Sequence, residues 1–339
     1  MRASVIIVTY NHARDVQRCL AALLPTLGDQ DELIVVDNAS LDASADVARR
    51  HGVRVERLQR NIGFGAACNH AARQSEADML VFLNPDTMPL PGWLDGLLDG
   101  LRHADLVTAK LLHLSDPSRI DAFGNDLHIS GIPTCRAWGE PSTSRTSVED
   151  VAAVSGACFA IRRSLFEQLG GFDERLFLYY EDDDLSLRAR LAGFRCIAVP
   201  HAIVLHDHRP GLSPAKLRYL ERNRVWCLLK LYRWRTLASL LPVLLSAEVI
   251  AWGLAGALGP RHVLAKARAW MEVLLLLRVL ACERGRVRRL VPDRDLIRLH
   301  GSWLPFRQVA AGPGAQLVER CVHVGFSAGR AFALRWGLN

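Results

Sequence analysis

Short apolar runs alternate with amphipathic segments through the first hundred residues, and this alternation constrains the fold more than any other feature. Strands buried in a parallel sheet read as continuous apolar runs, whereas the helices between them repeat about every 3.6 residues. The alternation is typical of βαβ units and predicts an α/β fold with a mixed, mainly parallel sheet. The expected strands are residues 4–9, 32–37, 53–59 and 78–83, and the expected helices are residues 13–24, 42–50 and 63–74.

The pattern changes further along the chain. Residues 113–150 are polar and irregular, which predicts a loop or hairpin insertion. An apolar run follows at 154–161, and helices are expected near 164–169 and 182–192. The eight cysteines are scattered singly, without the spacing of a metal site, which favours reduced thiols over a zinc site or a disulfide framework.

The charge is distributed unevenly. Residues 1–215 contain 21 basic and 28 acidic side chains, a net charge of −7, whereas residues 216–339 contain 21 and 7, a net charge of +14. An acidic part suits an enzyme with carboxylates in its cleft, and a basic part suits an anionic partner such as lipid headgroups or nucleic acid. We therefore predict two domains, 1–215 and 216–339, of which the second is a basic, apolar helical extension.

Residues 236–260 carry a single charge, Glu248, and are long enough to cross a bilayer. Pro242 and three glycines interrupt this run, and basic residues, Lys266 among them, lie on both sides of it. A single crossing would leave one basic cluster on the outer side, against the positive-inside bias. We therefore expect a peripheral or monotopic protein whose helices lie in an anionic membrane surface or dip into it and return. A wholly soluble helical bundle is the alternative.

Carboxylates follow two of the expected strands. Asp37 ends the second strand, and Asp86 follows the fourth in Leu-Asn-Pro-Asp-Thr. Open α/β sheets bind ligands at the carboxyl ends of their strands. There Asp37 can accept hydrogen bonds from a base or ribose, and Asp86 can bind a divalent cation that neutralises a diphosphate. Taken singly, each carboxylate is better explained as the cap of the following helix.

Four consecutive acids, Glu181 to Asp184, lie at the start of the helix expected at 182–192. The helix dipole accounts for one or two of them. Adjacent carboxylates repel one another, so the remaining acids must be kept in place by other parts of the structure. A carboxylate kept close to others has a raised pKa and can act as a general base. His206 ends a later apolar run and is either a structural histidine or a neutral metal ligand.

The chain carries these features within an ordered set of short motifs, at residues 4–11, 35–40, 61–69, 83–87, 156–162, 170–174, 181–185 and 222–223. Taken together over residues 3–230, the set resembles family 2 glycosyltransferases, most closely the rhamnosyltransferase-like branch of bacterial surface-polysaccharide enzymes. Each motif is weak alone, and the order makes the resemblance specific.

The resemblance implies a GT-A fold, a nucleotide-diphosphate sugar donor and a divalent metal, Mg²⁺ or Mn²⁺. The loop at residues 9–11 matches the segment that contacts the nucleotide, Asp37 matches the acid that binds the base or ribose, and residues 61–69 match the lining of the donor site. The residues assigned to donor binding are Thr9, Tyr10, Asn11, Asp37, Asn61, Gly63, Asn69 and Asn84.

The resemblance also assigns the metal site and the catalytic base. Asn84-Pro85-Asp86 matches the metal-binding DxD position, with Asn84 in place of the first acid, which leaves Asp86 as the main metal carboxylate. His206 matches the histidine that approaches the metal or the diphosphate. The Asp of the family's ED motif is the catalytic base and falls on Asp182, with Asp183 as the alternative if the register differs by one.

These assignments imply an inverting glycosyltransferase. Family analogy favours a deoxyhexose such as rhamnose on dTDP or UDP, a glycan or lipid-linked acceptor, and a place at the cytoplasmic face of the bacterial inner membrane. One alternative is a nucleic-acid-binding protein that uses the basic C-terminal half, although no reader motif is present. Another is a catalytically inactive relative that still binds sugar nucleotides. An NAD-dependent enzyme is disfavoured because the first strand-to-helix turn lacks G-x-G-x-x-G.

Overall fold

The computed structural model describes residues 2–209, 211–304 and 313–336. The chain forms two compact units. The first comprises Met1–Asn125, Cys135–Ser186 and Phe194–His208, and the second comprises Asp126–Thr134, Leu187–Gly193 and Arg209–Asn339. The boundary predicted at residue 215 stays a prediction, and the second unit also includes two short segments that no sequence pattern set apart.

A ten-stranded mixed sheet forms the centre of the first unit. Its strands are β1 (Ala3–Thr9), β2 (Glu32–Asp37), β3 (Arg54–Arg57), β4 (Met79–Leu83), β5 (Thr87–Pro89), β6 (Leu106–His113), β7 (Asp116–Ala122), β10 (Glu149–Asp150), β11 (Cys158–Arg162) and β12 (Cys196–His206). Their order is β10-β12-β6-β11-β4-β1-β2-β3, with β5 paired to β12 and β7 to β6. The run β4-β1-β2-β3 is parallel throughout, and β6 and β12 are also parallel, whereas β11 is antiparallel to both its neighbours.

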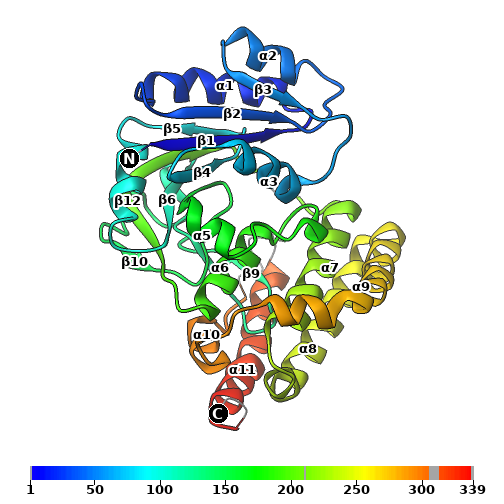
Figure 1. Ribbon diagram of the computed structural model, residues 1–339. Coiled ribbons are helices and arrows are strands. Elements are labelled where there is room, and N and C mark those ends of the chain that lie inside the picture. Colours follow the sequence, from blue (N-terminus) through cyan, green and yellow to red (C-terminus); the bar gives the residue numbers. More distant parts are fainter. Residues whose placement is uncertain (1, 210, 305–312, 337–339) are drawn as a thin grey trace. The chain divides into compact units, whose positions relative to one another are not determined.

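Helices pack on both faces of the parallel part of this sheet (Figure 1), with α1 and α2 on one face and α3 on the other, as right-handed crossovers require. The helical segments that begin in this unit are α1 (Ala13–Leu23), η1 (Leu24–Thr26), α2 (Ser44–Arg50), α3 (Phe64–Gln74), α4 (Trp93–Gly100), α5 (Arg163–Gln168), η2 (Glu174–Leu176) and α6 (Glu181–Leu191). All seven residues of β1 are buried, as expected for a central strand covered on both sides. The predicted α/β fold with a mixed, mainly parallel sheet is confirmed.

The segment 113–150 is more regular than its sequence suggests. It contributes β7 and β10 to the main sheet, and β8 (Asn125–Leu127) pairs with β9 (Pro133–Cys135). The expectation of an irregular loop was wrong for these strands, whereas the hairpin alternative agrees with the antiparallel pairing of β7 with β6 and with the β8–β9 pair. They are short, and β7 alternates poorly because only its last three residues are buried. Its pairing with β6, which shifts register twice, provides the order that the local pattern does not show.

The second unit is mainly helical. Its helices are α7 (Pro214–Leu231), α8 (Trp234–Leu258), α9 (Pro260–Arg286), α10 (Asp293–Leu299) and α11 (Pro313–Trp336). Ser213 caps α7 by accepting a hydrogen bond from the Lys216 amide at 3.2 Å, and Pro214 occupies the first helical position, where its missing N–H costs nothing. Helix α8 is long and apolar enough to cross a membrane by length and composition. The predicted helical C-terminal region is confirmed.

Candidate active site

The loops after β1 and β2 are tied together at the carboxyl edge of the sheet. The Asn38 amide donates to the Thr9 carbonyl at 2.9 Å, and the Asn11 amide donates to Ser40 Oγ at 2.9 Å. Asn11 has a φ of 58°, a conformation that Asn tolerates better than most residues, and its Oδ1 accepts from the Leu41 amide at 2.7 Å. The predicted nucleotide loop at residues 9–11 is therefore held in one conformation.

Two buried polar atoms lie side by side on this edge without a hydrogen bond from any described residue. They are Thr9 Oγ1 and Asp37 Oδ2, on residues that are register partners in the β1–β2 pair. The other Asp37 oxygen accepts from the Ser40 amide at 3.2 Å, and Oδ2 lies 3.3 Å from Arg57 Nε. Buried polar groups in folded proteins nearly always have partners, so such atoms indicate a place where a ligand or water binds. Tyr10 is 41% exposed next to them in the chain.

The segment before α3 holds the loop that leads to α6. Gly63 has a φ of 92°, and a Cβ on it would lie 2.6 Å from the Phe177 carbonyl oxygen. The Phe64 amide donates to the same oxygen at 2.7 Å. Asn61 Oδ1 accepts from the Gly63 amide at 2.9 Å and from Asn38 Nδ2 at 3.0 Å. Only glycine fits this approach, and Asn61 fixes the turn that makes it.

Asn69 faces the same loop. Its Nδ2 donates to the Phe172 carbonyl at 3.0 Å and to Glu174 Oε1 at 3.1 Å, and its Oδ1 accepts from the Phe172 amide at 2.9 Å. A buried amide paired in this way fixes the position of the backbone it binds. In the structure the polar side-chain atoms of Asn69 form hydrogen bonds with residues 172–174. Its predicted role in donor binding stays a prediction.

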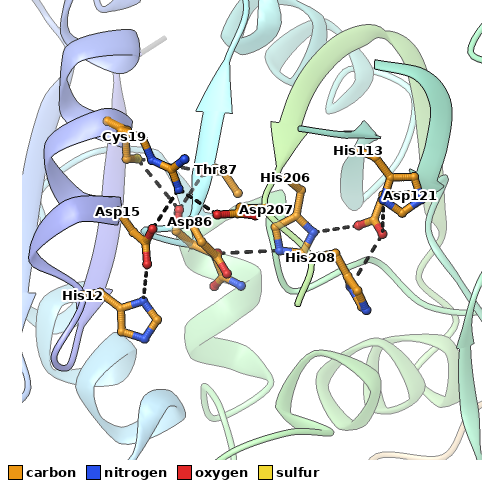
Figure 2. A network of polar contacts seen from close by, with 12 residues as sticks. His12, Asp15, Cys19, Asp86, Thr87, His113, Asp121, His206, Asp207 and His208 are labelled. Atoms are coloured by element: carbon orange, nitrogen blue, oxygen red, sulfur yellow. Dashed lines mark hydrogen bonds and ion pairs between the residues drawn. The ribbon is translucent and has the colours of Figure 1, made fainter. Parts of the chain in front are cut away.

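His206 lies between two carboxylates (Figure 2). Its Nδ1 is 2.7 Å from Asp121 Oδ2, and its Nε2 is 3.6 Å from Asp86 Oδ1. The antiparallel pairing of β12 with β5 places His206 opposite Thr87, the residue after Asp86. The sheet thus brings together the two residues that the sequence assigned to a metal. Asn84 begins the turn that leads to Asp86, and its backbone amide donates to the Ala157 carbonyl at 2.9 Å.

The charges of this cluster favour a cation. Burial opposes ionisation of Asp86, but the nearby His206, whose Nε2 lies 3.6 Å from Asp86 Oδ1, outweighs it and holds the pKa of Asp86 below its usual value. Burial likewise opposes protonation of His206, and the carboxylates of Asp121 and Asp86 outweigh it and raise the pKa of His206 to about 10. The space between the two carboxylates therefore stabilises positive charge.

Asp121 is the part of this cluster that the sequence analysis missed. It lies near the end of β7, in the segment predicted as irregular, and its Oδ1 faces His113 Nδ1 at 3.4 Å and His208 Nδ1 at 3.6 Å. Asp121, His206 and His208 offer ligand atoms within 4.8 Å of one another, a second arrangement that can hold a metal ion. The available signal was a single acid inside the apolar run from Ile120 to Phe123.

Of the four acids that open α6, Asp182 alone is half-exposed, and the other three are buried. The Gly156 amide donates to Asp182 Oδ2 at 2.6 Å. Asn125 Nδ2 lies 3.3 Å from the same oxygen and 3.1 Å from Asp183 Oδ1. These hydrogen bonds from Gly156 and Asn125 stabilise the adjacent carboxylates of Asp182 and Asp183. The sequence analysis did not identify either donor.

Burial sets the protonation of these acids. It raises the pKa of Asp182, although the hydrogen bonds from Gly156 and Asn125 act in the opposite direction. Burial and the charge of Asp182 raise the pKa of Glu181 to about 8 and the pKa of Asp183 well above its ordinary value. A carboxylate with a raised pKa is a stronger proton acceptor, which suits a general base.

Comparison with known proteins identifies the family of the chain. Residues 4–170 match the model of Glycosyl transferase family 2. The chain is 31% identical over 242 residues to N-acetylglucosaminyl-diphospho-decaprenol L-rhamnosyltransferase of Mycobacterium tuberculosis (strain CDC 1551 / Oshkosh), a match that covers 62% of this chain and 78% of the relative.

Solved structures share the fold. Residues 1–349 of TarS from S. aureus, in complex with UDP-GlcNAc, match with a TM-score of 0.57 at 17% identity, over 97% of this chain and 92% of that chain. Mannosyltransferase PcManGT from Pyrobaculum calidifontis, in complex with GDP-Man and Mn²⁺, matches with a TM-score of 0.51 at 17% identity, over 98% and 85%. The predicted GT-A fold is confirmed, and the motifs, the fold and the M. tuberculosis relative together show that this chain belongs to glycosyltransferase family 2.

Proposed function

We propose that this chain is an inverting, metal-dependent glycosyltransferase that moves a sugar from a nucleotide diphosphate to an acceptor hydroxyl. The observation that carries the proposal is the position of His206, with Nδ1 bound to Asp121 and Nε2 directed at Asp86. Histidines that ligate metals commonly donate their other ring N–H to a carboxylate, which fixes the tautomer and the ring orientation.

The donor nucleotide binds at the carboxyl ends of β1 and β2. Thr9 Oγ1 is buried and lacks a hydrogen bond from the described residues, and Asp37 Oδ2 is buried beside Arg57 Nε at 3.3 Å, so a base or ribose would supply further donors to these atoms. The loop at residues 9–11 closes one side of this site. The donor is dTDP- or UDP-linked, and a deoxyhexose such as rhamnose is supported by the M. tuberculosis relative, which is a rhamnosyltransferase.

Asp86 and His206 fit a divalent metal, Mg²⁺ or Mn²⁺. Asp86 Oδ1 is buried and lacks a hydrogen bond from the described residues. It faces His206 Nε2, because the other ring nitrogen of His206, Nδ1, is bound to Asp121. The structural neighbour PcManGT holds Mn²⁺ with its sugar nucleotide. When bound, the metal neutralises the charge that develops on the leaving diphosphate. Asp121 orients the His206 ring through the hydrogen bond at Nδ1.

Asp182 takes the proton from the acceptor hydroxyl. Gly156 and Asn125 both bind its Oδ2, so we assign the proton to Oδ1. Its partial exposure allows contact with an acceptor, whereas Asp183 is 2% exposed. Displacement by the acceptor oxygen from the face opposite the leaving group inverts the anomeric carbon and needs no covalent sugar–enzyme bond. The acceptor is a glycan or a lipid-linked glycan at the cytoplasmic face of the bacterial inner membrane.

A thermal-shift panel of nucleotide-sugars, each with Mn²⁺, Mg²⁺ or chelator, tests the proposal. A donor at a hundred times its dissociation constant stabilises the fold by about 2.7 kcal/mol. We expect one donor class to give this shift only with metal, and Asp86→Ala to lose it. Asp46→Ala, which removes an exposed acid paired with Arg49 in α2, is the matched control and should keep the shift. A shift of equal size in chelator would contradict the metal assignment.

A further inference from the structure

Helices α8 and α9 both expose large apolar side chains, which together we call the apolar face. Its members recur every three or four residues along α8 and at intervals of seven, three and one residues along α9, and each is between 37% and 73% exposed. They are Leu241, Leu245, Val249 and Trp252 on α8, and Leu264, Met271, Leu274 and Leu275 on α9. Monomeric proteins rarely leave a surface of this kind uncovered.

The apolar face is separate from the packing between the helices. The side of α8 that packs within the unit is formed by Leu240, Val243 and Ala247, and that of α9 by Ala265, Ala269 and Val273, all buried. Only 17% of the most apolar stretch of α8 is buried. A core helix of a soluble protein would have most of that stretch covered.

The single acid of α8 is neutralised inside the unit. Glu248 pairs with Arg224 of α7, with Lys266 of α9 at 2.9 Å and with Trp270 Nε1 at 3.1 Å. Glu221 of α7 pairs with the same two cations, Arg224 at 3.0 Å and Lys266. Lys266, one of the basic residues that flank the apolar run, is fully buried and so is not a surface cation. Two acids and two bases balance within this cluster.

This cluster decides how α8 can meet a membrane. If α8 crossed the bilayer as a single span, Glu248 would leave Arg224 and Lys266 and enter hydrocarbon alone. Breaking a buried pair in this way is strongly unfavourable because it leaves uncompensated buried charge. If α8 and α9 instead lie in the membrane plane, the cluster stays intact and only the apolar face is buried in lipid.

The exposed charge of these helices is cationic. Each acidic residue of α7 to α10 is buried or half-buried and lies in an ion pair with a basic residue of the same unit. Exposed arginines flank the apolar face or lie within it: Arg235, Arg261, Arg268, Arg278 and Arg286. Arginines beside exposed leucines are typical of helices that bind anionic lipid, whose headgroups attract the cations while the acyl region takes up the apolar side chains.

We propose that the apolar face of α8 and α9 is a monotopic docking surface for an anionic lipid bilayer, with both helices in the plane of the membrane. The proposal extends the proposed function by identifying the surface that would bring the enzyme to a lipid-linked acceptor. Lipid binding itself needs neither donor nor metal, so it is tested separately from catalysis.

The test is flotation of the full chain, purified without detergent, with preformed vesicles. Vesicles of phosphatidylglycerol and phosphatidylcholine should carry the protein upward at low salt, vesicles of phosphatidylcholine alone should carry much less, and high salt should weaken binding. Val249→Glu should lower the partition coefficient on anionic vesicles by at least about tenfold, since it replaces lipid burial of a valine with a charge. Val148→Glu, at a 55% exposed valine of the first unit, is the matched control and should float as the unaltered chain does.

Three outcomes would overturn the proposal. The first is a chain that stays at the bottom with anionic vesicles, and the second is an equal loss for Val249→Glu and Val148→Glu. The third is a salt-sensitive shift with duplex DNA but not with vesicles, which would assign the basic surface to nucleic acid. The donor-induced thermal shift of Val249→Glu should equal that of the unaltered chain, so a failure of the proposed function is distinguishable from a failure of docking.

Discussion

Alanine at Gly63 tests how the structure positions the catalytic helix. A Cβ there would lie 2.6 Å from the Phe177 carbonyl oxygen and 2.8 Å from its Cα, and the backbone keeps a φ of 92°. With a ψ of 163°, this backbone lies in a region that essentially only glycine adopts, and it costs alanine about 1–3 kcal/mol. Overpacking adds about 1–3 kcal/mol, and loss of the hydrogen bond from the Phe64 amide adds about 0.5–1.5 kcal/mol. Together these contributions predict that Gly63→Ala destabilises the protein by about 3–7 kcal/mol.

Gly52→Ala separates the two contributions. Gly52 has a φ of 73°, but a Cβ on it meets no atom within 4 Å. Its alanine variant should therefore show only the conformational cost of about 1–2 kcal/mol. At about 2–4 °C per kcal/mol, the two variants should differ in melting temperature by several degrees. Thermal unfolding followed by circular dichroism measures the difference.

The same substitution should lower activity, because Phe177 belongs to the segment that leads to Asp182. A displacement of about 1 Å at a catalytic group can cost about 100-fold in rate. We expect Gly63→Ala to lose sugar transfer by about that factor in the fraction that stays folded, while Gly52→Ala keeps it. If the two variants melt together and transfer at equal rates, the contact with Phe177 is not what requires glycine at position 63.

Three further predictions concern the acids. Asp86→Ala should weaken Mn²⁺ binding in calorimetry by more than the 10–100-fold typical of losing a group that only supports a ligand, and unchanged affinity would remove Asp86 from the metal site. Asp182→Asn should keep donor affinity and lower turnover by about 10²–10⁴-fold, and a large loss confined to Asp183→Asn would move the base by one residue. Glu181 has a folded-state pKa of about 8 against an ordinary 4.5, so its bound proton stabilises the fold at low pH and that contribution is lost as pH rises towards 8. Glu181→Gln should therefore gain stability relative to the unaltered chain between pH 5 and 8 in urea unfolding, and parallel pH profiles would contradict this.

The strand-end residues of the site could be predicted from sequence because their signals are local. Apolar runs defined β1, β2 and β4 to within one residue at each end, and with them the positions of Asp37 and Asp86. Asn61 and Gly63 were assigned only through the family resemblance, whereas four adjacent acids marked the start of α6. These features depend on side-chain period and turn chemistry within short windows.

The partners of those residues could not be predicted, because they arrive through pairings distant in the sequence. Asp121 reaches His206 only because β7 and β12 both pair with β6. Asn125 reaches Asp182 and Asp183 from a segment with no clear period. Lys266 reads as a flanking surface cation, yet it is buried against Glu248 and Glu221. Sequence shows that a charge is present, and only the tertiary structure shows which charges are neutralised.

The most direct test of the central claim is a transfer assay with the full chain, a metal and a nucleotide-sugar that passes the thermal-shift panel. The chain is incubated with a lipid-linked glycan acceptor, release of nucleoside diphosphate is followed, and the anomeric configuration of the product is determined by NMR. We expect release that requires both acceptor and metal, that Asp86→Ala abolishes, and that yields the inverted anomer. Full transfer in the presence of chelator, or a product that retains the donor's configuration, would contradict the metal site at Asp86 and His206 or the role of Asp182 as base.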